Sequence, residues 1–280
     1  MRPIILYRRP GYEDRDVEFV KELEAMNKHF LTVGSRMDVC SNELIIPRYS
    51  SLPYYKELEY DVNIIDSQLI NSYRQHEYVA DLNNYYWDLE GITPKTWMRP
   101  CDVPTNEEGS FVLKGKTNSK KFCWDTLMFA ADRSKIMDVY CGLQEDSLIG
   151  CQDIYIRKFV PLYNYAISVR SLPISKEFRF FVAYKQILCG AFYWSSFAEW
   201  IKEQTGSVPS ADEVPMEFLK EVIGRVGDKI NAYVIDIAQT VEDEWIVVEL
   251  NDFTMSGLCE NEPEILYSRL KEVLMERDIY

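Results

Sequence analysis

Four lysines fall within eight residues near the middle of the chain, and small or polar residues separate them: Lys114, Lys116, Lys120 and Lys121. A flexible loop with this composition can close over a polyphosphate, although a solvated hairpin tip has the same composition. The lysine cluster alone therefore does not decide between the two interpretations, and residues elsewhere in the chain are needed.

Gly115-Lys116-Thr117 invites comparison with the phosphate-binding P-loop. That motif needs an earlier glycine where Ser110 stands, and its lysine opens a helix. Here the lysines follow an apparent strand at residues 111–113 instead. We therefore exclude a P-loop.

A second cluster is acidic and lies near the other end of the chain. Asp236 falls inside one apolar run, and Glu249 and Asn251 fall in another, residues 245–252. Alternate residues of a strand share a face, so Glu249 and Asn251 project together. A carboxylate in an apolar strand is costly unless it is paired or binds a cation. If the two strands are neighbours, the oxygens suit Mg²⁺; the alternative is a hairpin with an acidic solvent face.

Three strand-borne cations lie between these clusters. Arg157 and Lys158 occur in the expected strand 154–160, and Arg179 follows Glu177 and Phe178 at the start of the next one. A guanidinium group is a preferred clamp for phosphate or carboxylate, but a strand arginine is also often exposed or salt-bridged.

The hydrophobic pattern predicts a mixed α/β or α+β protein, because strands and helices are interspersed. The chain begins with strands at 3–7 and 43–47, which flank a helix that carries Val17, Val20, Leu23 and Phe30 on one face, and one or two helices follow at 66–90. Later strands are expected at 111–113, 154–160, 178–184, 187–193, 233–238 and 245–250, and later helices at 122–138, 215–232 and 262–277. A polar stretch with three prolines, residues 94–109, suggests a domain junction.

Composition narrows the chemistry further. The 280 residues hold 31 Lys and Arg against 45 Asp and Glu, a net charge of −14, which works against broad contact with nucleic-acid phosphates. Two histidines exclude a His-rich zinc site, so catalysis would rely on carboxylates, Lys, Arg and a metal. Seven cysteines without a C-x-x-C pair are expected to be reduced thiols. No apolar run is long enough to cross a membrane, so we expect a cytoplasmic protein.

Taken in chain order, these features resemble the ATP-grasp superfamily over roughly residues 91–252. The features are Lys114 after a strand, the lysine loop, the strand that ends at 159–161, Glu177-Phe178-Arg179, Asp236, and Glu249-Leu250-Asn251. Arg157-Lys158 and the Glu-Phe-Arg sequence look similar to a divergent clade, which includes the eukaryotic cell-division-cycle protein that helps to assemble translation initiation factor two, with relatives in bacteria and phages.

The resemblance implies a pre-grasp α/β domain at residues 1–95, a lysine-loop subdomain at 96–161, and a core subdomain with the metal site at 162–280. The two subdomains would clasp ATP between their sheets. Two departures are visible: the loop has a single glycine, Gly115, and Arg157-Lys158 stand where the family usually offers a carboxylate to the ribose.

The resemblance also implies roles for individual residues. Lys114 and Lys116 would hold phosphate oxygens, Lys116 with a catalytic part, and the loop through Lys120 and Lys121 would close over them. The full set expected around the nucleotide is Lys114, Lys116, Lys120, Lys121, Arg157 and Lys158. Arg179 would act in catalysis on the γ-phosphate or the acyl intermediate, and Mg²⁺ would be held by Asp236, Glu249 and Asn251. Arg48 is the first candidate for a substrate contact, together with Arg179.

The implied activity is that of an ATP-dependent carboxylate–amine ligase that forms an amide or peptide bond through an acyl phosphate. Its substrates would be ATP, a small-molecule or peptide carboxylate and an amine, with a protein acceptor as a further option. The alternative is a non-catalytic ATP-binding assembly factor or regulatory protein that acts on a protein partner. A third hypothesis, modification of nucleic-acid ends by the lysine cluster, conflicts with the net charge.

Overall fold

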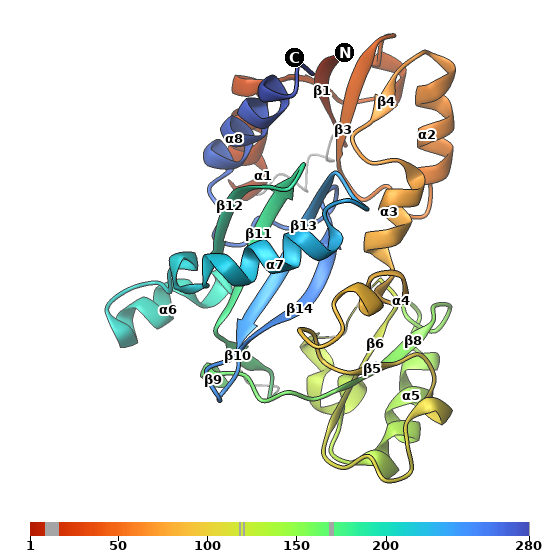
Figure 1. The fold of residues 1–280 in the computed structure, drawn as a ribbon, viewed down its shortest axis with the longest axis vertical. Coiled ribbons are helices and arrows are strands. Elements are labelled where there is room, and N and C mark those ends of the chain that lie inside the picture. Colours follow the sequence, from red (N-terminus) through yellow and green to blue (C-terminus); the bar gives the residue numbers. More distant parts are fainter. Residues whose placement is uncertain (9–16, 118, 120, 168–170, 280) are drawn as a thin grey trace.

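The computed structural model describes residues 1–280 except 9–16, 118, 120, 168–170 and 280. Figure 1 shows an α/β region that holds both ends of the described chain, a central antiparallel sheet, and a smaller α+β region at the far end. The mixed α/β class predicted from the sequence is confirmed.

The N-terminal sheet is parallel, with strands in the order β2-β1-β3-β4. The strands are β1 (Arg2–Tyr7), β2 (Leu31–Val33), β3 (Glu43–Arg48) and β4 (Gln68–Leu69). One face packs on α2 (Tyr55–Ile64), and the other packs on α1 (Val17–His29) and α8 (Pro263–Glu276). Both faces are covered, which explains the unbroken apolar run of β1.

One sequence prediction for this region needs correction, and one helix was not predicted. The buried residues of α1 are Ala25 and Met26, whereas Val17 and Val20 are exposed. Helix α2 was not predicted, because Glu57, Glu59 and Asp61 break its apolar pattern. The predicted segment 66–90 forms two short helices, α3 (Tyr73–Ala80) and α4 (Leu82–Tyr85), after β4.

The smaller α+β region has a sheet with the order β5-β8-β6-β7 and one covering helix, α5 (Ile136–Gln144). Its strands are β5 (Thr96–Trp97), β6 (Phe111–Gly115), β7 (Phe129–Ala130) and β8 (Ile154–Lys158). The predicted helix at 122–138 is wrong. Most of the segment forms short 3-10 turns, a single π-helical turn and then β7, and only residues 136–138 are α-helical, at the start of α5. The rings of Trp124 and Phe129 pack against each other and against Phe159. Tertiary aromatic packing thus outweighs helical periodicity here.

The central sheet is antiparallel, in the order β12-β11-β13-β14. Its strands are β11 (Glu177–Ala183), β12 (Gln186–Phe192), β13 (Ala232–Gln239) and β14 (Trp245–Asp252). In Figure 1, α7 (Met216–Val226) crosses one face of this sheet, and α6 (Ser195–Thr205) follows β12. A small hairpin, β9 (Asn164–Ile167) and β10 (Pro173–Ser175), leads into β11. The four strands and α7 were predicted; α6 and the hairpin were not.

The three large sheets fall within the three predicted domain ranges, but the cores between them are shared. Phe181 and Val234 of the central sheet pack in one cluster with Ile5 and Ile46 of the N-terminal sheet. The division at residues 95 and 161 stays a prediction.

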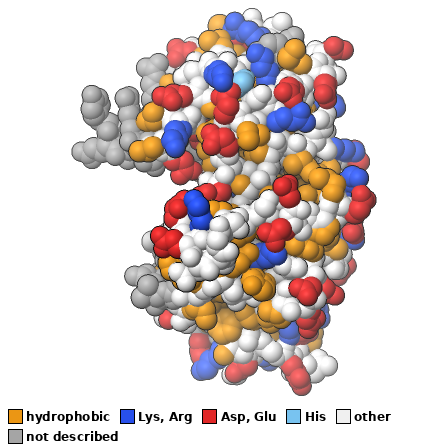
Figure 2. Space-filling model, turned by 90° about the vertical axis from the view of Figure 1, so that its left-hand side faces the viewer, with side chains coloured by type: hydrophobic (Ala, Val, Ile, Leu, Met, Phe, Trp, Pro, Cys, Tyr) orange, Lys and Arg blue, Asp and Glu red, His pale blue; other side chains and the backbone are white. Residues whose placement is uncertain are grey.

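The described surface mixes both signs of charge. Figure 2 shows acidic and basic side chains interspersed over one face of the molecule. Among the described residues, no helix combines the length and apolarity that a membrane span needs.

Candidate functional site

The register of the central sheet places three charged residues side by side. Arg179 on β11 is opposite Asp236 on β13, and Asp236 is opposite Glu249 on β14. Residues directly opposite each other in an antiparallel sheet share a face. Asn251 follows on the same face of β14, so the structure brings together four residues that the sequence predicted for the site.

These four side chains form one hydrogen-bonded network. Arg179 donates from Nε and Nη2 to the two carboxylate oxygens of Asp236, at 2.8 and 2.7 Å. Asn251 Nδ2 donates to Asp236 Oδ2 at 2.8 Å and to Glu249 Oε1 at 3.3 Å. Burial alone would lower the pKa of Arg179, but the Asp236 carboxylate raises it well above its ordinary value. The guanidinium of Arg179 therefore stays charged.

The described lysines approach this network from the smaller α+β region. Lys114 on β6 is buried and pairs with Glu249. Burial alone would raise the pKa of Glu249, but Lys114 and Lys121 together hold it well below its ordinary value. Lys116 lies further out and pairs with Asp81 at 2.8 Å. Lys120 lies outside the described residues.

Lys121 rests on an aromatic residue that the sequence analysis did not single out. Its Nζ donates to the hydroxyl of Tyr193 at 2.6 Å and lies 4.1 Å from the centre of that ring. The guanidinium of Arg179 lies 4.8 Å from the same ring. Tyr193 thus contacts two cations of the site. It follows directly after β12, and nothing in its sequence spacing marks it.

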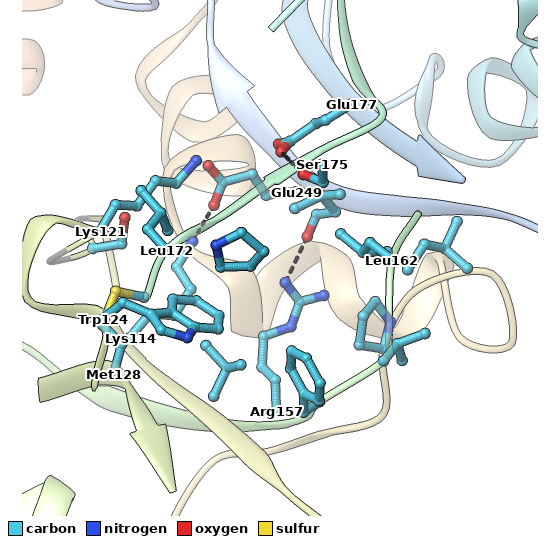
Figure 3. A pocket seen from close by; sticks show the side chains of 18 of the residues that line it. Lys114, Lys121, Trp124, Met128, Arg157, Leu162, Leu172, Ser175, Glu177 and Glu249 are labelled. Atoms are coloured by element: carbon cyan, nitrogen blue, oxygen red, sulfur yellow. Dashed lines mark hydrogen bonds and ion pairs between the residues drawn. The ribbon is translucent and has the colours of Figure 1, made fainter. Parts of the chain in front are cut away.

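An apolar cavity of about 140 Å³ opens between the central sheet and the sheet of the smaller α+β region. Figure 3 shows Trp124, Met128 and Leu172 around it, with the charged groups of Lys114, Lys121 and Glu249 at one end. Side chains of β14, Ile246 and Val248, complete the apolar wall. The cavity suits a flat apolar group that carries polar substituents at one end.

Glu177 lines this cavity and was not among the predicted site residues. Its Oε2 accepts a hydrogen bond from Ser175 Oγ at 3.1 Å, but Oε1 has no partner within the described part of the chain. Burial raises the pKa of Glu177 to about 7, and the nearby Lys121 limits the rise. Its place directly before Phe178-Arg179 was the available signal.

A second, polar cavity of about 330 Å³ continues from the first. The two share the lining residues Lys114, Ser119, Lys121 and Glu249. The polar cavity adds Lys116, Arg179, Tyr193, Asn251 and the turn that follows β14, residues 255–257. Together the cavities form an apolar pocket that opens into a charged one.

Arg157 and Lys158 border the apolar cavity, but their charged groups are engaged elsewhere. Arg157 is buried, and its Nη1 and Nη2 donate to Val248 O at 2.5 Å and Thr93 Oγ1 at 2.8 Å. Lys158 Nζ donates to Glu107 Oε1 at 3.0 Å. Arg157 therefore ties β8 to β14, which sets the width of the cavity (Figure 3).

Arg48, the first candidate for a substrate contact, does not line either cavity, and its role as a substrate contact stays a prediction. Its Nε donates to Glu22 at 2.8 Å, and its Nη atoms donate to the carbonyl oxygens of Phe253 and Ser256 at 2.7 and 2.8 Å. All three guanidinium nitrogens are engaged, and the side chain is 6% exposed. Arg48 therefore stabilises the turn after β14 by hydrogen bonds to its carbonyl groups.

The donor set of Asp236, Glu249 and Asn251 fits Mg²⁺. All three can offer oxygen, and Mg²⁺ takes few protein ligands and completes its shell with phosphate oxygens and water. The described residues contain no group of three or more His, Cys, Asp or Glu placed to hold a metal ion by themselves. Glu177 Oε1, which has no hydrogen-bond partner among the described residues, is a further acceptor in the wall of the apolar cavity.

Comparison with known proteins agrees with this geometry. A family described as "ATP-grasp domain, R2K clade family 3" matches residues 104–270. No curated protein sequence matches the chain. Solved structures share the fold at low sequence identity. An ATP-grasp RimK domain protein from Sphaerobacter thermophilus aligns with a TM-score of 0.60 at 11% identity, over 97% of this chain and 99% of that one.

Two ligases give similar values. PsnB, complexed with a minimal precursor, Mg and ADP, aligns with a TM-score of 0.57 at 11% identity, over 98% of this chain and 97% of that one. D-alanyl-alanine synthetase A from Vibrio cholerae aligns with a TM-score of 0.56 at 10% identity, over 99% and 98%. At these identities the similarity establishes the fold.

Proposed function

The chain belongs to the R2K clade of the ATP-grasp superfamily, and on that premise we propose that it uses ATP to join a carboxylate to an amine. The observation that carries the proposal is the continuity of the apolar and charged cavities through Lys114, Lys121 and Glu249. An elongated ligand with a flat base at one end and phosphates at the other matches this arrangement.

The adenine base would occupy the apolar cavity, between Met128 and Leu172 on its walls. Glu177 Oε1, for which the described residues offer no hydrogen-bond partner, would accept a hydrogen bond from a ribose hydroxyl. Glu177 would thus supply the carboxylate that Arg157-Lys158 do not offer. Lys114 and Lys121 would then lie beside the phosphates.

Asp236, Glu249 and Asn251 would hold Mg²⁺, which, when bound, neutralises phosphate charge and polarises the γ-phosphoryl group. We expect the ion pairs of the site to exchange partners when Mg²⁺ and ATP bind. Lys114 now pairs with Glu249, and Arg179 with Asp236. Each cation would turn to phosphate as its carboxylate turns to the metal.

In the reaction, a carboxylate oxygen of the substrate attacks the γ-phosphorus of ATP, and ADP leaves. The amine then attacks the acyl carbon of the resulting acyl phosphate, loses a proton, and displaces inorganic phosphate. Arg179 would stabilise the charge on the transferred phosphoryl group by its guanidinium fork. Lys116, at the outer end of the polar cavity, would contact the outer phosphate oxygens.

The substrates belong to the classes that the structural relatives use. One structure of PsnB is a complex with a precursor peptide, and another relative is named D-alanyl-alanine synthetase A. We propose a small-molecule or peptide carboxylate and an amine, on a peptide or a protein acceptor, as the substrates of this chain.

Thermal unfolding tests the nucleotide part of the proposal. Mg²⁺ with ATP at about 100 times its Kd adds about 2.7 kcal/mol, which raises the midpoint by roughly 5 °C for a chain of this size. We expect this rise with ATP and a much smaller one with GTP. Lys114→Met should abolish it, and Lys202→Met, an exposed helix lysine, should not.

Release of ADP tests the ligase part. We expect ADP only when a carboxylate and an amine are both supplied, and loss of that release in Arg179→Met. A folded protein that binds Mg-ATP, releases no ADP with any acceptor, and binds a protein partner in a nucleotide-dependent way would instead establish the assembly-factor alternative.

A further inference from the structure

A third cavity lies in the N-terminal part of the molecule, between the end of β3 and the start of α2. Its volume is about 390 Å³. The described residues that line it are Arg36, Tyr49, Ser50, Ser51, Tyr54, Glu57 and Leu58. None of these residues lines the apolar or the polar cavity of the candidate site. The cavity is therefore a separate feature, and the proposed ligation does not use it.

A buried hydroxyl without a partner lies in its wall. Ser51 is 3% exposed, and its Oγ has no hydrogen-bond partner among the described residues. Buried polar atoms without partners are uncommon in folded proteins, and a bound ligand is one way to satisfy them. The adjacent Ser50 differs, since it is exposed and its Oγ donates to Met255 Sδ at 3.9 Å.

The same wall contains the first turn of α2. The N-cap residue, Tyr54, makes no side-chain capping bond, and the first intrahelical donor is the Leu58 N–H to Tyr54 O at 3.0 Å. The N–H groups before Leu58 and the helix dipole favour a negative group at this end. Arg36 adds a positive charge; its guanidinium contacts Asp61 at 2.8 Å, and its side chain is 54% exposed.

The cavity also carries the opposite charge. Glu57 is exposed and lines the cavity, and within the described chain no ion-pair partner reaches it. A simple anion would be repelled by this carboxylate, whereas a ligand with an ammonium group would be attracted. Tyr49, Tyr54 and Leu58 offer apolar surface beside these charges.

We propose that this cavity binds a free α-amino acid. Its carboxylate would meet the Ser51 hydroxyl, Arg36 and the start of α2, its ammonium group would meet Glu57, and an uncharged side chain would pack on Tyr54 and Leu58. Ser51 and Tyr54 flank the residue Leu52, which lines the polar cavity. The amino acid would thus bind on the other side of a loop that forms a wall of the nucleotide site.

Isothermal titration calorimetry of the full chain without nucleotide tests the proposal. The probes are leucine, N-acetyl-leucine, which lacks the ammonium group, and leucinamide, which lacks the carboxylate. We expect saturable binding of leucine and at least roughly tenfold weaker binding of both analogues, because each loses one charged contact. Equal binding of all three, or no binding of leucine at millimolar concentration, would overturn it.

Variants locate the binding within the molecule. Ser51→Ala and Glu57→Gln should each weaken leucine binding by about tenfold. Ser50→Ala is the matched control and should leave the affinity unchanged. Glu57 is on the surface, so its variant keeps the proposal testable even if Ser51→Ala destabilises the loop. Unchanged affinity in a folded Glu57→Gln variant would contradict the assignment.

The outcome does not depend on the ligase proposal, because the titration contains no nucleotide. The rise in unfolding temperature with Mg-ATP, measured on the same variants, should be that of the wild type. A variant that lost leucine binding and kept this rise would support two separate sites, whereas the parallel loss of both effects would refute the separation.

Discussion

The buried pair of Arg179 and Asp236 gives the strongest prediction about stability. Asp236 is fully buried and Arg179 is 8% exposed at the side chain. Removal of one partner leaves an uncompensated charge in the sheet, which costs about 3 to 5 kcal/mol. We therefore expect Arg179→Met, and separately Asp236→Leu, to lower the unfolding midpoint by roughly 6 to 10 °C at about 2 °C per kcal/mol.

The double variant separates this effect from lost packing. The apolar pair Arg179→Met/Asp236→Leu removes both charges of this pair together, so neither is left without its partner, and its stability should lie within about 1 to 2 kcal/mol of the wild type. Asn251 still has Glu249 as an acceptor at 3.3 Å. The double variant should nevertheless show no stabilisation by Mg-ATP, since it lacks a metal ligand and a phosphate contact.

Urea unfolding at neutral pH measures these differences, with the slope of the transition checked for each variant. The control is the exposed pair Lys220 and Glu217, 2.8 Å apart with side chains 63% and 85% exposed, whose removal should change stability by less than about 1 kcal/mol. Two results would each refute the claim that the two buried charges stabilise each other. One is that the single variants at Arg179 and Asp236 cost no more than this control, and the other is that their costs simply add in the double variant.

Three further changes have expected outcomes on stability. Folding raises the pKa of Glu177 from 4.5 to about 7. The protonated carboxyl therefore stabilises the folded state fully below pH 4.5, and this stabilisation, about 3 kcal/mol, is lost as pH rises through 7. Urea unfolding across this range should show this fall in the free energy of unfolding for the wild type and not for Glu177→Gln. Tyr193→Phe removes the hydroxyl that accepts from Lys121 and should cost about 1 to 3 kcal/mol in the same assay. Tyr193→Leu should cost about 1 kcal/mol more, because the contact between the ring and the cation is lost as well. Equal costs for the two variants would argue against the ring contact. Arg48→Met should cost about 3 kcal/mol, because Glu22 loses its cationic partner and keeps the Tyr267 hydroxyl. The affinity for Mg-ATP should stay unchanged in calorimetry; a large loss of affinity would show that Arg48 supports the nucleotide site.

The sequence predicts the central sheet well, because its strands combine β-branched and aromatic residues with clear turns. The placement of Asp236 against Glu249 also follows from it, since strand periodicity fixes which residues share a face. The superfamily inferred from the order of these motifs is confirmed. The roles assigned to the individual residues stay predictions.

Other parts of the site depend on tertiary contacts that no local pattern contains. Tyr193 and Glu177 reach the cavities because β11 begins and β12 ends there, and only the paired sheet brings them near Lys121. The position of Arg48 outside both cavities could not be predicted, because an arginine that bonds carbonyl groups has the same local sequence as one that binds a substrate. The segment after Lys121 was misassigned because the ring of Phe159, distant in the chain, competes with its helical period.

The charges of the site explain why nucleotide and metal should bind together. Lys114 neutralises Glu249, and Arg179 neutralises Asp236. Neither ion pair therefore leaves a charge unpaired for a ligand to bind. ATP alone would have to draw the two cations away and leave two buried carboxylates unpaired, and Mg²⁺ alone would leave two buried cations unpaired; both states are costly. Bound together, the two ligands satisfy every group at once. The network therefore predicts strong positive coupling between Mg²⁺ and ATP, with little affinity for either ligand by itself.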